Sequence, residues 1–182
     1  KTMSMEDIMQ EYGCFGRGDN RFPSFKIEDA NGRIVSELKY LSHKITDGRQ
    51  NLPDLPHLDV NTDDVMSLEI LLEDIVTGMN LSLLYVVFEE SNIIARHTVI
   101  SNPTNKTVYI QQLDSATLDF PAQRHELITL YGSWGRERWL ERYPLHHGIC
   151  SVGSTLGATG HAQSSFAALV SPETTEDSGS VY

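Results

Sequence analysis

The stretch MSLEILLEDIVTGMNLSLLYVVFEESNIIARHTVIS, residues 66–101, decides the fold class, because it holds three strand-like runs in succession. In the first run, residues 66–74, apolar side chains alternate with polar ones, which predicts a strand with one buried face. The residues expected on that face are Met66, Leu68, Ile70 and Leu72. The second run, residues 81–90, is apolar on both faces near its middle and rich in β-branched and aromatic residues. The third run covers residues 93–101.

Similar runs lie on either side of this stretch. Strands are expected over residues 24–28, 34–45 and 107–120, and residues 1–10 could form one or two helical turns. The pair Asn31-Gly32 predicts a hairpin between the first two of these strands, because both residues tolerate a positive φ angle. Short strands separated by turns, with no alternation of strands and helices, predict an all-β protein: a large antiparallel β-sandwich with long loops and little helix.

The composition excludes some classes of partner. The chain has 182 residues and a net charge of −11. No basic stripe is present to pair with phosphates, so neither nucleic acid nor an anionic membrane surface is an expected partner. The two cysteines, Cys14 and Cys150, lie far apart, which favours a reducing compartment. We therefore expect a cytoplasmic protein.

The densest chemical segment is LITLYGSWGRERWLERYPLHHGI, residues 127–149. It contains both tryptophans, Trp134 and Trp139, and an arginine cluster that consists of Arg136, Arg138 and Arg142. An arginine fork binds carboxylates and stacks on aromatic rings, and a tryptophan offers a broad apolar face of the kind that contacts sugar rings. An ion-paired structural loop has the same composition. The residues alone leave both interpretations open.

No motif for catalysis is present. The sequence lacks a G-x-S-x-G nucleophile turn and a glycine-rich phosphate loop. His146 and His147 are adjacent, so on a strand they would point to opposite faces, which disfavours a zinc site with Cys150. A glycosidase needs a pair of carboxylates at a defined separation, and no such pair can be chosen from sequence. We expect no catalytic residue, metal site or cofactor in this chain.

Several long segments, in a consistent order from about Gln10 to Tyr182, resemble the N-terminal β-sandwich domain of glycoside hydrolase family 36 α-galactosidases, or melibiases. The segments are EYGCFGRGDNRFP (11–23), VSELKYLSHKITDGRQNLPDLP (35–56), LSLLYVVFEESNIIARHTVISN (81–102), SATLDFP (115–121), GSWGRERWLERYPLHHGICSV (132–152) and GATGHAQSSFAALV (157–170). The resemblance implies a supersandwich of the galactose-mutarotase type.

The resemblance also implies a function. The full protein would be a retaining α-galactosidase that removes terminal α-linked galactose from melibiose, raffinose and stachyose. Residues 1–182 would form one non-catalytic N-terminal domain, inactive alone, and a (β/α)8 catalytic domain with two catalytic aspartates would follow. A homotetramer is expected, with this domain helping to build the interface and border the active-site mouth. An independent carbohydrate-binding module and a purely structural sandwich are the alternatives.

Individual positions match the family pattern. Asp19 and Arg21 match an Asp-Phe-Arg motif in which Asn20 replaces phenylalanine, and residues 136–139 match an Arg-Glu-Arg run. His161 matches a family histidine usually followed by glutamine, but Ala162 follows it here. The residues expected to contact substrate, the catalytic domain or a neighbouring subunit are Asp19, Arg21, Trp134, Arg136 and Arg138.

Overall fold

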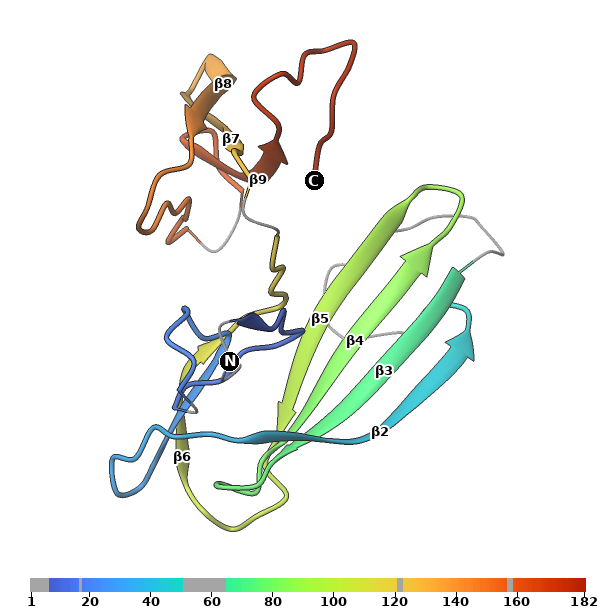
Figure 1. The fold of residues 1–182 in the computed structure, drawn as a ribbon, viewed down its shortest axis with the longest axis vertical. Helices are drawn as coiled ribbons and strands as arrows, with labels where there is room; N and C mark the ends of the chain where they lie inside the picture. The colour runs from blue at the N-terminus through green and yellow to red at the C-terminus, as the bar shows by residue number, and fades with distance from the viewer. Residues whose placement is uncertain (1–6, 17, 51–64, 121–122, 157–158) are drawn as a thin grey trace. The chain divides into compact units, whose positions relative to one another are not determined.

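The computed structural model describes residues 7–16, 18–50, 65–120, 123–156 and 159–182. The chain divides into two compact units, Lys1–Asp119 and Phe120–Tyr182, which are described separately below. All of the named elements are strands, and every pairing between them is antiparallel (Figure 1). The all-β, antiparallel prediction is confirmed. The expectation of a single domain over residues 1–182 stays a prediction.

The first unit contains two sheets. A four-stranded sheet has the order β2-β3-β4-β5, and a two-stranded sheet pairs β1 with β6 (Figure 1). The strands are β1 (Phe25–Asp29), β2 (Leu38–Asp47), β3 (Val65–Asp74), β4 (Asn80–Phe88), β5 (Ile93–Ser101) and β6 (Val108–Leu113). The three runs predicted within residues 66–101 are therefore strands, and they are neighbours in one sheet.

The core of this unit lies between the two sheets. Phe25 and Ile27 of β1 are fully buried and cluster with Leu81 and Leu83 of β4. Val108 of β6 and other partly buried apolar residues pack against this cluster. Burial of these side chains stabilises the sandwich, since each large apolar residue removed from water contributes about 1.5–3 kcal/mol. The two layers are thus held by contacts between segments distant in sequence.

The face of the four-stranded sheet that packs against β1 and β6 is buried at one end of the strands and exposed at the other. β3 pairs with β4 without a bulge, so every second side chain of β3 points to the same face of the sheet. The predicted set on one face, Met66, Leu68, Ile70 and Leu72, is therefore confirmed. Ile70 and Leu72 pack against the core, but Met66 is 51% exposed. Met66 lies beside Val87 of β4 and, one strand further, Ile94 of β5, and these side chains are also exposed. We call these three residues, together with Ile45 of β2, the open apolar row.

The alternation was misleading at one position on the opposite face. Ser67 was expected on the exposed face of β3, yet it is only 2% exposed. Its hydroxyl donates to the Gly48 carbonyl at 2.8 Å and accepts from the Gln50 amide at 3.0 Å. Because both hydrogen bonds are made, the buried hydroxyl carries little desolvation cost.

Two other expectations are wrong. The Asn31-Gly32 turn forms, but the strands around it do not make a hairpin, since β1 pairs with β6 and β2 pairs with β3. The strand expected over residues 107–120 ends at Leu113. The possible helix over residues 1–10 stays a prediction, because residues 1–6 lie outside the described residues and, of residues 7–10, Asp7 alone has a helical (3-10) conformation. In the described part of the chain, no helix is long and apolar enough to cross a membrane.

Tyr12 joins the N-terminal segment to the sandwich. Its hydroxyl contacts the Asp114 carbonyl at 2.6 Å and the Ser24 carbonyl at 3.1 Å, and its side chain belongs to the core cluster. Desolvation by burial raises the pKa of Tyr12 to about 12.

Replacing Tyr12 with phenylalanine should lower the free energy of unfolding at neutral pH by about 1 kcal/mol, because the hydroxyl's hydrogen bonds to two carbonyls are lost. The raised pKa also predicts a pH effect. The stabilisation is fully present below the pKa of an unfolded tyrosine and is lost as the pH rises through the folded-state pKa of about 12. Urea denaturation at a series of alkaline pH values should therefore show a weaker pH dependence in Tyr12→Phe. Equal slopes for the two proteins would contradict this assignment.

The second unit is a three-stranded sheet with the order β8-β7-β9 (Figure 1). Its strands are β7 (Glu126–Ser133), β8 (Arg136–Pro144) and β9 (Gln163–Val170). The chain end pairs with β9, since Leu169 and Tyr182 exchange backbone hydrogen bonds of 2.8 and 2.9 Å. The ring of Tyr182 also lies 5.2 Å from that of Phe120. Residues 127–149 therefore contain most of a β-hairpin rather than a loop.

Candidate functional site

The five predicted site residues fall into two groups, one in each unit. Trp134, Arg136 and Arg138 lie at or beside the tip of the β7–β8 hairpin. Asp19 and Arg21 lie in the loop that precedes β1. Each group is described within its own unit.

A two-residue connection, Trp134-Gly135, forms the tip of the hairpin. Gly135 has a φ of 76°, a left-handed conformation that glycine adopts without steric cost. The Glu137 carboxylate accepts a 2.8 Å hydrogen bond from the Gly135 amide, and this bond is the main reason why the pKa of Glu137 is lowered. The tip is therefore closed by its own charge-assisted contact, which fixes the hairpin that presents Trp134.

Trp134 is 87% exposed at this tip. A tryptophan normally buries a large apolar area, so Trp134 is a candidate for contact with another molecule or domain. Trp139 is half-exposed on β8, and the Arg136 guanidinium lies 5.0 Å from its ring centroid. This distance is within the range of a cation–π interaction. Of the two tryptophans, Trp139 is held by a neighbour and Trp134 projects into solvent.

Arg138 has a φ of 59°, which is uncommon for a residue with a side chain. It helps to line a pocket of about 370 Å³ on the second unit. The other lining residues are Leu130, Glu137, Thr159, Gly160, His161 and Ser164. Strained backbone concentrates at functional sites, so the coincidence of strain and pocket supports a functional interpretation of this position. The family resemblance includes Arg138 and His161. Thr159 and Ser164 belong to no motif, so the sequence does not predict their place in this pocket.

Arg142, the third arginine of the cluster, has a structural role. Its guanidinium forms an ion pair with Glu126 and donates to the carbonyls of Thr174, Ser171 and Pro172 at 2.7, 3.0 and 2.8 Å. These contacts tie the segment after β9 to the β7–β8 hairpin.

Replacing Arg142 with methionine should lower the free energy of unfolding by about 2 kcal/mol, because the Glu126 carboxylate and the three carbonyls lose their shared donor. Arg142→Lys should fall between methionine and the wild type, since lysine keeps the charge but lacks the planar fork. Thermal unfolding monitored by circular dichroism is a suitable measurement. A lysine variant as unstable as the methionine variant would show that charge contributes nothing here.

In the first unit, Asp19 and Arg21 pair with each other. The Arg21 Nε and Nη2 atoms donate to the two Asp19 carboxylate oxygens at 2.9 and 3.0 Å, and Nη1 donates to Asp119 at 2.7 Å. Asp119 also accepts a 2.9 Å hydrogen bond from the Gln10 amide. The hydrogen bond from the Arg21 side chain is the main reason why the pKa of Asp19 is lowered. Asp119 is the third charged residue of this cluster. It lies 98 residues from Arg21 in the sequence, so no local pattern predicts that the two pair.

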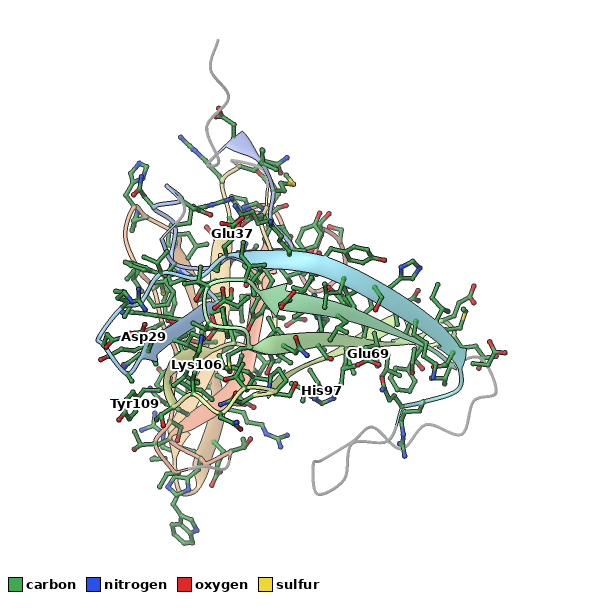
Figure 2. All side chains as sticks on the ribbon, turned by 90° about the horizontal axis from the view of Figure 1, so that it is seen from below. Asp29, Glu37, Glu69, His97, Lys106 and Tyr109 are labelled. Carbon is green, nitrogen blue, oxygen red and sulfur yellow. The ribbon has the colours of Figure 1, made fainter. Side chains whose placement is uncertain are left out.

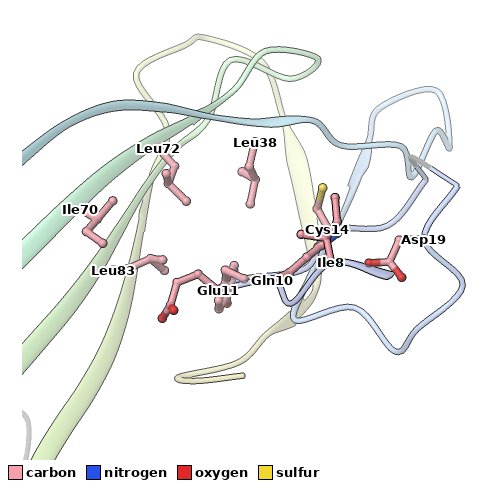
Figure 3. A pocket seen from close by; sticks show the side chains of 10 residues that line it. Ile8, Gln10, Glu11, Cys14, Asp19, Leu38, Ile70, Leu72 and Leu83 are labelled. Atoms are coloured by element: carbon pink, nitrogen blue, oxygen red, sulfur yellow. The ribbon is translucent and has the colours of Figure 1, made fainter. Parts of the chain in front are cut away.

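An apolar pocket of about 350 Å³ lies beside this cluster, between the N-terminal segment and the sheet (Figure 3). Leu38, Ile70, Leu72 and Leu83 face it from the sheet, and Glu11 and Asp19 line it from the N-terminal part of the chain. The exposed carboxylate of Glu11 accepts hydrogen bonds from the Tyr85 hydroxyl and from Arg96 Nη1, whose guanidinium stacks 3.9 Å from the Tyr85 ring centroid. The pocket therefore has charged groups that are already paired, and it offers mainly an aliphatic surface.

The described residues contain no group of three or more histidine, cysteine or carboxylate side chains that could hold a metal ion. His146, His147 and Cys150 are all exposed, and they lie after β8 ends. The expectations of no catalytic residue, metal or cofactor stay predictions.

Comparison with known proteins defines the class of domain. The whole chain, residues 1–182, matches the family described as the glycosyl hydrolase family 36 N-terminal domain. The chain therefore belongs to this family, as the sequence resemblance indicated.

The relatives give the length and structural context. The chain is 36% identical over its full length to "Alpha-galactosidase AgaA" of Geobacillus stearothermophilus, and it spans 25% of that protein. It is 33% identical over its full length to "Bifunctional alpha-galactosidase/sucrose kinase AgaSK" of Mediterraneibacter gnavus, and it spans 20% of that protein. The crystal structure of a G. stearothermophilus AgaA variant in complex with raffinose superposes with a TM-score of 0.93 at 35% identity, covering 98% of this chain and 25% of the other. The chain thus spans about a quarter of the length of such relatives.

Proposed function

We propose that this chain is the non-catalytic N-terminal domain of a retaining α-galactosidase that hydrolyses terminal α-linked galactose from oligosaccharides such as melibiose, raffinose and stachyose. The observation that carries the proposal is the match to AgaA in complex with raffinose, which extends over 98% of the chain at 35% identity. In this proposal the catalytic nucleophile and the acid/base are two aspartates on a (β/α)8 domain outside these 182 residues. A retaining mechanism requires those carboxyl groups to lie about 5 Å apart.

The test compares the full-length protein with the 182-residue chain. Both are incubated with an aryl α-galactoside and an aryl β-galactoside, and release of the aryl alcohol is followed. The full-length protein should cleave only the α-galactoside, and the chain alone should cleave neither. A full-length protein that binds galactose but leaves the α-galactoside intact would overturn the proposal. Cleavage by the chain alone would show that the domain is catalytic.

The proposal includes a role in assembly. We expect a homotetramer in the cytoplasm, in which this domain helps to build the subunit interface and borders the mouth of the active site. The open apolar row supports a buried interface, because large apolar side chains grouped on one sheet face favour association. Light scattering of the full-length protein at several concentrations tests the oligomeric state. A monomer at all concentrations would remove this part of the proposal.

A second candidate function is independent carbohydrate binding, which the exposure of Trp134 favours. The test is a titration of the chain with melibiose while tryptophan fluorescence is recorded. Saturable quenching that is lost in Trp134→Ala but kept in Trp139→Phe would support a binding module. No saturable change in the wild-type chain would exclude it. In that case Trp134 is better explained as a contact to the catalytic domain or to another subunit.

A further inference from the structure

The turn after β1 contains a reactive pair of residues that the proposed function does not use. Asn31 and Gly32 are both exposed in this turn. One oxygen of the Asp29 carboxylate accepts hydrogen bonds from the Asn31 amide at 2.8 Å and the Arg33 amide at 3.0 Å. The Gly32 amide donates to the Asp29 carbonyl at 3.0 Å. Figure 2 shows Asp29 at the end of the strand that leads into the turn.

The Asn31 side chain is exposed, and the Gly32 amide can attack it once the 3.0 Å hydrogen bond to the Asp29 carbonyl opens. Among the described residues, the hydrogen bonds of Asn31 involve its backbone amide, and none holds its side-chain amide. Gly32 has a φ of 79°, and a Cβ atom added to it would meet only the end of the Glu28 side chain, at 3.9 Å. The space beside the Gly32 Cα atom is therefore open. Glycine also allows the backbone rotation that brings these two groups together, because it has few steric restrictions.

We propose that Asn31 is a site of spontaneous deamidation. The deprotonated Gly32 backbone nitrogen attacks the Asn31 Cγ atom, a carbon–nitrogen bond forms, and the bond from Cγ to the side-chain nitrogen breaks with release of ammonia. Water then opens the cyclic imide at Cγ to give aspartate, or at the backbone carbonyl to give isoaspartate. No oxidant, metal or enzyme is required.

The sequence makes this site selective. Asn31 is the only asparagine in the chain that is followed by glycine. The asparagines at positions 20, 51, 61, 80, 92 and 105 precede residues whose Cβ atoms hinder attack, and Asn102 precedes proline, which has no amide hydrogen to lose.

The modification would change the turn. Formation of the imide removes the Gly32 amide hydrogen, so the 3.0 Å bond to the Asp29 carbonyl is lost. Either product adds a carboxylate next to Asp29, whose own carboxylate is paired with Arg33 at 2.7 Å. An isoaspartate also lengthens the backbone by one methylene group. The new charge would line a pocket of about 290 Å³ that includes Lys106.

The experiment incubates the folded chain at mildly alkaline pH and follows tryptic peptides by mass spectrometry. The peptide that contains Asn31 should gain the mass of an amide-to-acid exchange before any other asparagine-containing peptide, and it should split into aspartate and isoaspartate forms. In water enriched in ¹⁸O, the product should contain the label. Hydroxylamine, which cleaves cyclic imides of this type, should cut the chain between residues 31 and 32.

Two controls make the result decisive. Asn31→Ser should remove both the mass change and the hydroxylamine cleavage, with the far-ultraviolet circular dichroism spectrum unchanged. A synthetic peptide covering the turn gives the unrestrained rate. The proposal is overturned if the peptide deamidates while Asn31 in the folded chain stays intact, since the fold would then protect the site. It is also overturned if other asparagines react as fast as Asn31.

Discussion

Asp74→Ala should lower the free energy of unfolding of the first unit by about 4 kcal/mol, because three hydrogen-bond donors, among them the buried Thr77 hydroxyl, lose one buried acceptor together. The Asp74 carboxylate is fully buried at the end of β3. It accepts hydrogen bonds from the Glu37 amide at 2.8 Å, the Val76 amide at 3.2 Å and the Thr77 hydroxyl at 2.5 Å. These contacts connect the residues just before β2 to the turn between β3 and β4. Urea denaturation followed by circular dichroism measures the loss.

Asp74→Asn is the matched control. The asparagine carbonyl can still accept from the Glu37 and Val76 amides, and its amide group can donate to the Thr77 hydroxyl. We therefore expect a loss clearly smaller than that of alanine. Equal losses in the two variants would mean that the negative charge, rather than the number of satisfied donors, stabilises this turn.

The second large effect is expected for Gly132→Ala in the β7–β8 hairpin. A Cβ atom at this position would lie 2.2 Å from the Arg136 carbonyl oxygen and 2.9 Å from the Glu137 Cα atom. Both are backbone atoms, so no side-chain rotation can relieve the overlap. The register is also irregular here, between Tyr131 and Ser133. We expect a loss of about 4 kcal/mol or a rearranged hairpin, since overpacking against backbone forces the strands apart.

Gly153→Ala is the control for this variant, because an added Cβ there meets no atom within 4 Å. It should leave the melting temperature nearly unchanged. A displaced hairpin would also alter the surroundings of Trp134 and Trp139, so Gly132→Ala should shift the tryptophan emission maximum. A Gly132→Ala protein with wild-type stability and emission would show that the approach to Arg136 can relax at low cost.

The sequence predicted strands where burial and alternation agree. β4 and β5 were recognised because they are long and rich in apolar and β-branched residues. β8 was not recognised, since its charged and aromatic residues are almost all exposed and show no alternation. The false hairpin at Asn31-Gly32 has a different cause. A turn motif reports local backbone preference, and the partner of β1 is β6, about 80 residues away.

The candidate site was predictable in part. Asp19 and Arg21 are two residues apart, so their ion pair is a local feature that sequence can suggest. Arg142 was noticed only as a member of the arginine cluster. Three of its partners are backbone carbonyls about 30 residues away, which any sequence could supply. The family resemblance identified the class of domain because it depends on many segments at once, not on one pair of residues.

The open apolar row has a practical consequence for the purification and storage of this chain. Met66, Val87, Ile94 and Ile45 present hydrocarbon to water from four adjacent strands. At high protein concentration we expect such a surface to favour aggregation and binding to hydrophobic resins. Met66→Ser and Ile94→Ser should each reduce aggregation in concentrated samples. Neither change alters the buried core between the two sheets, because both side chains are exposed.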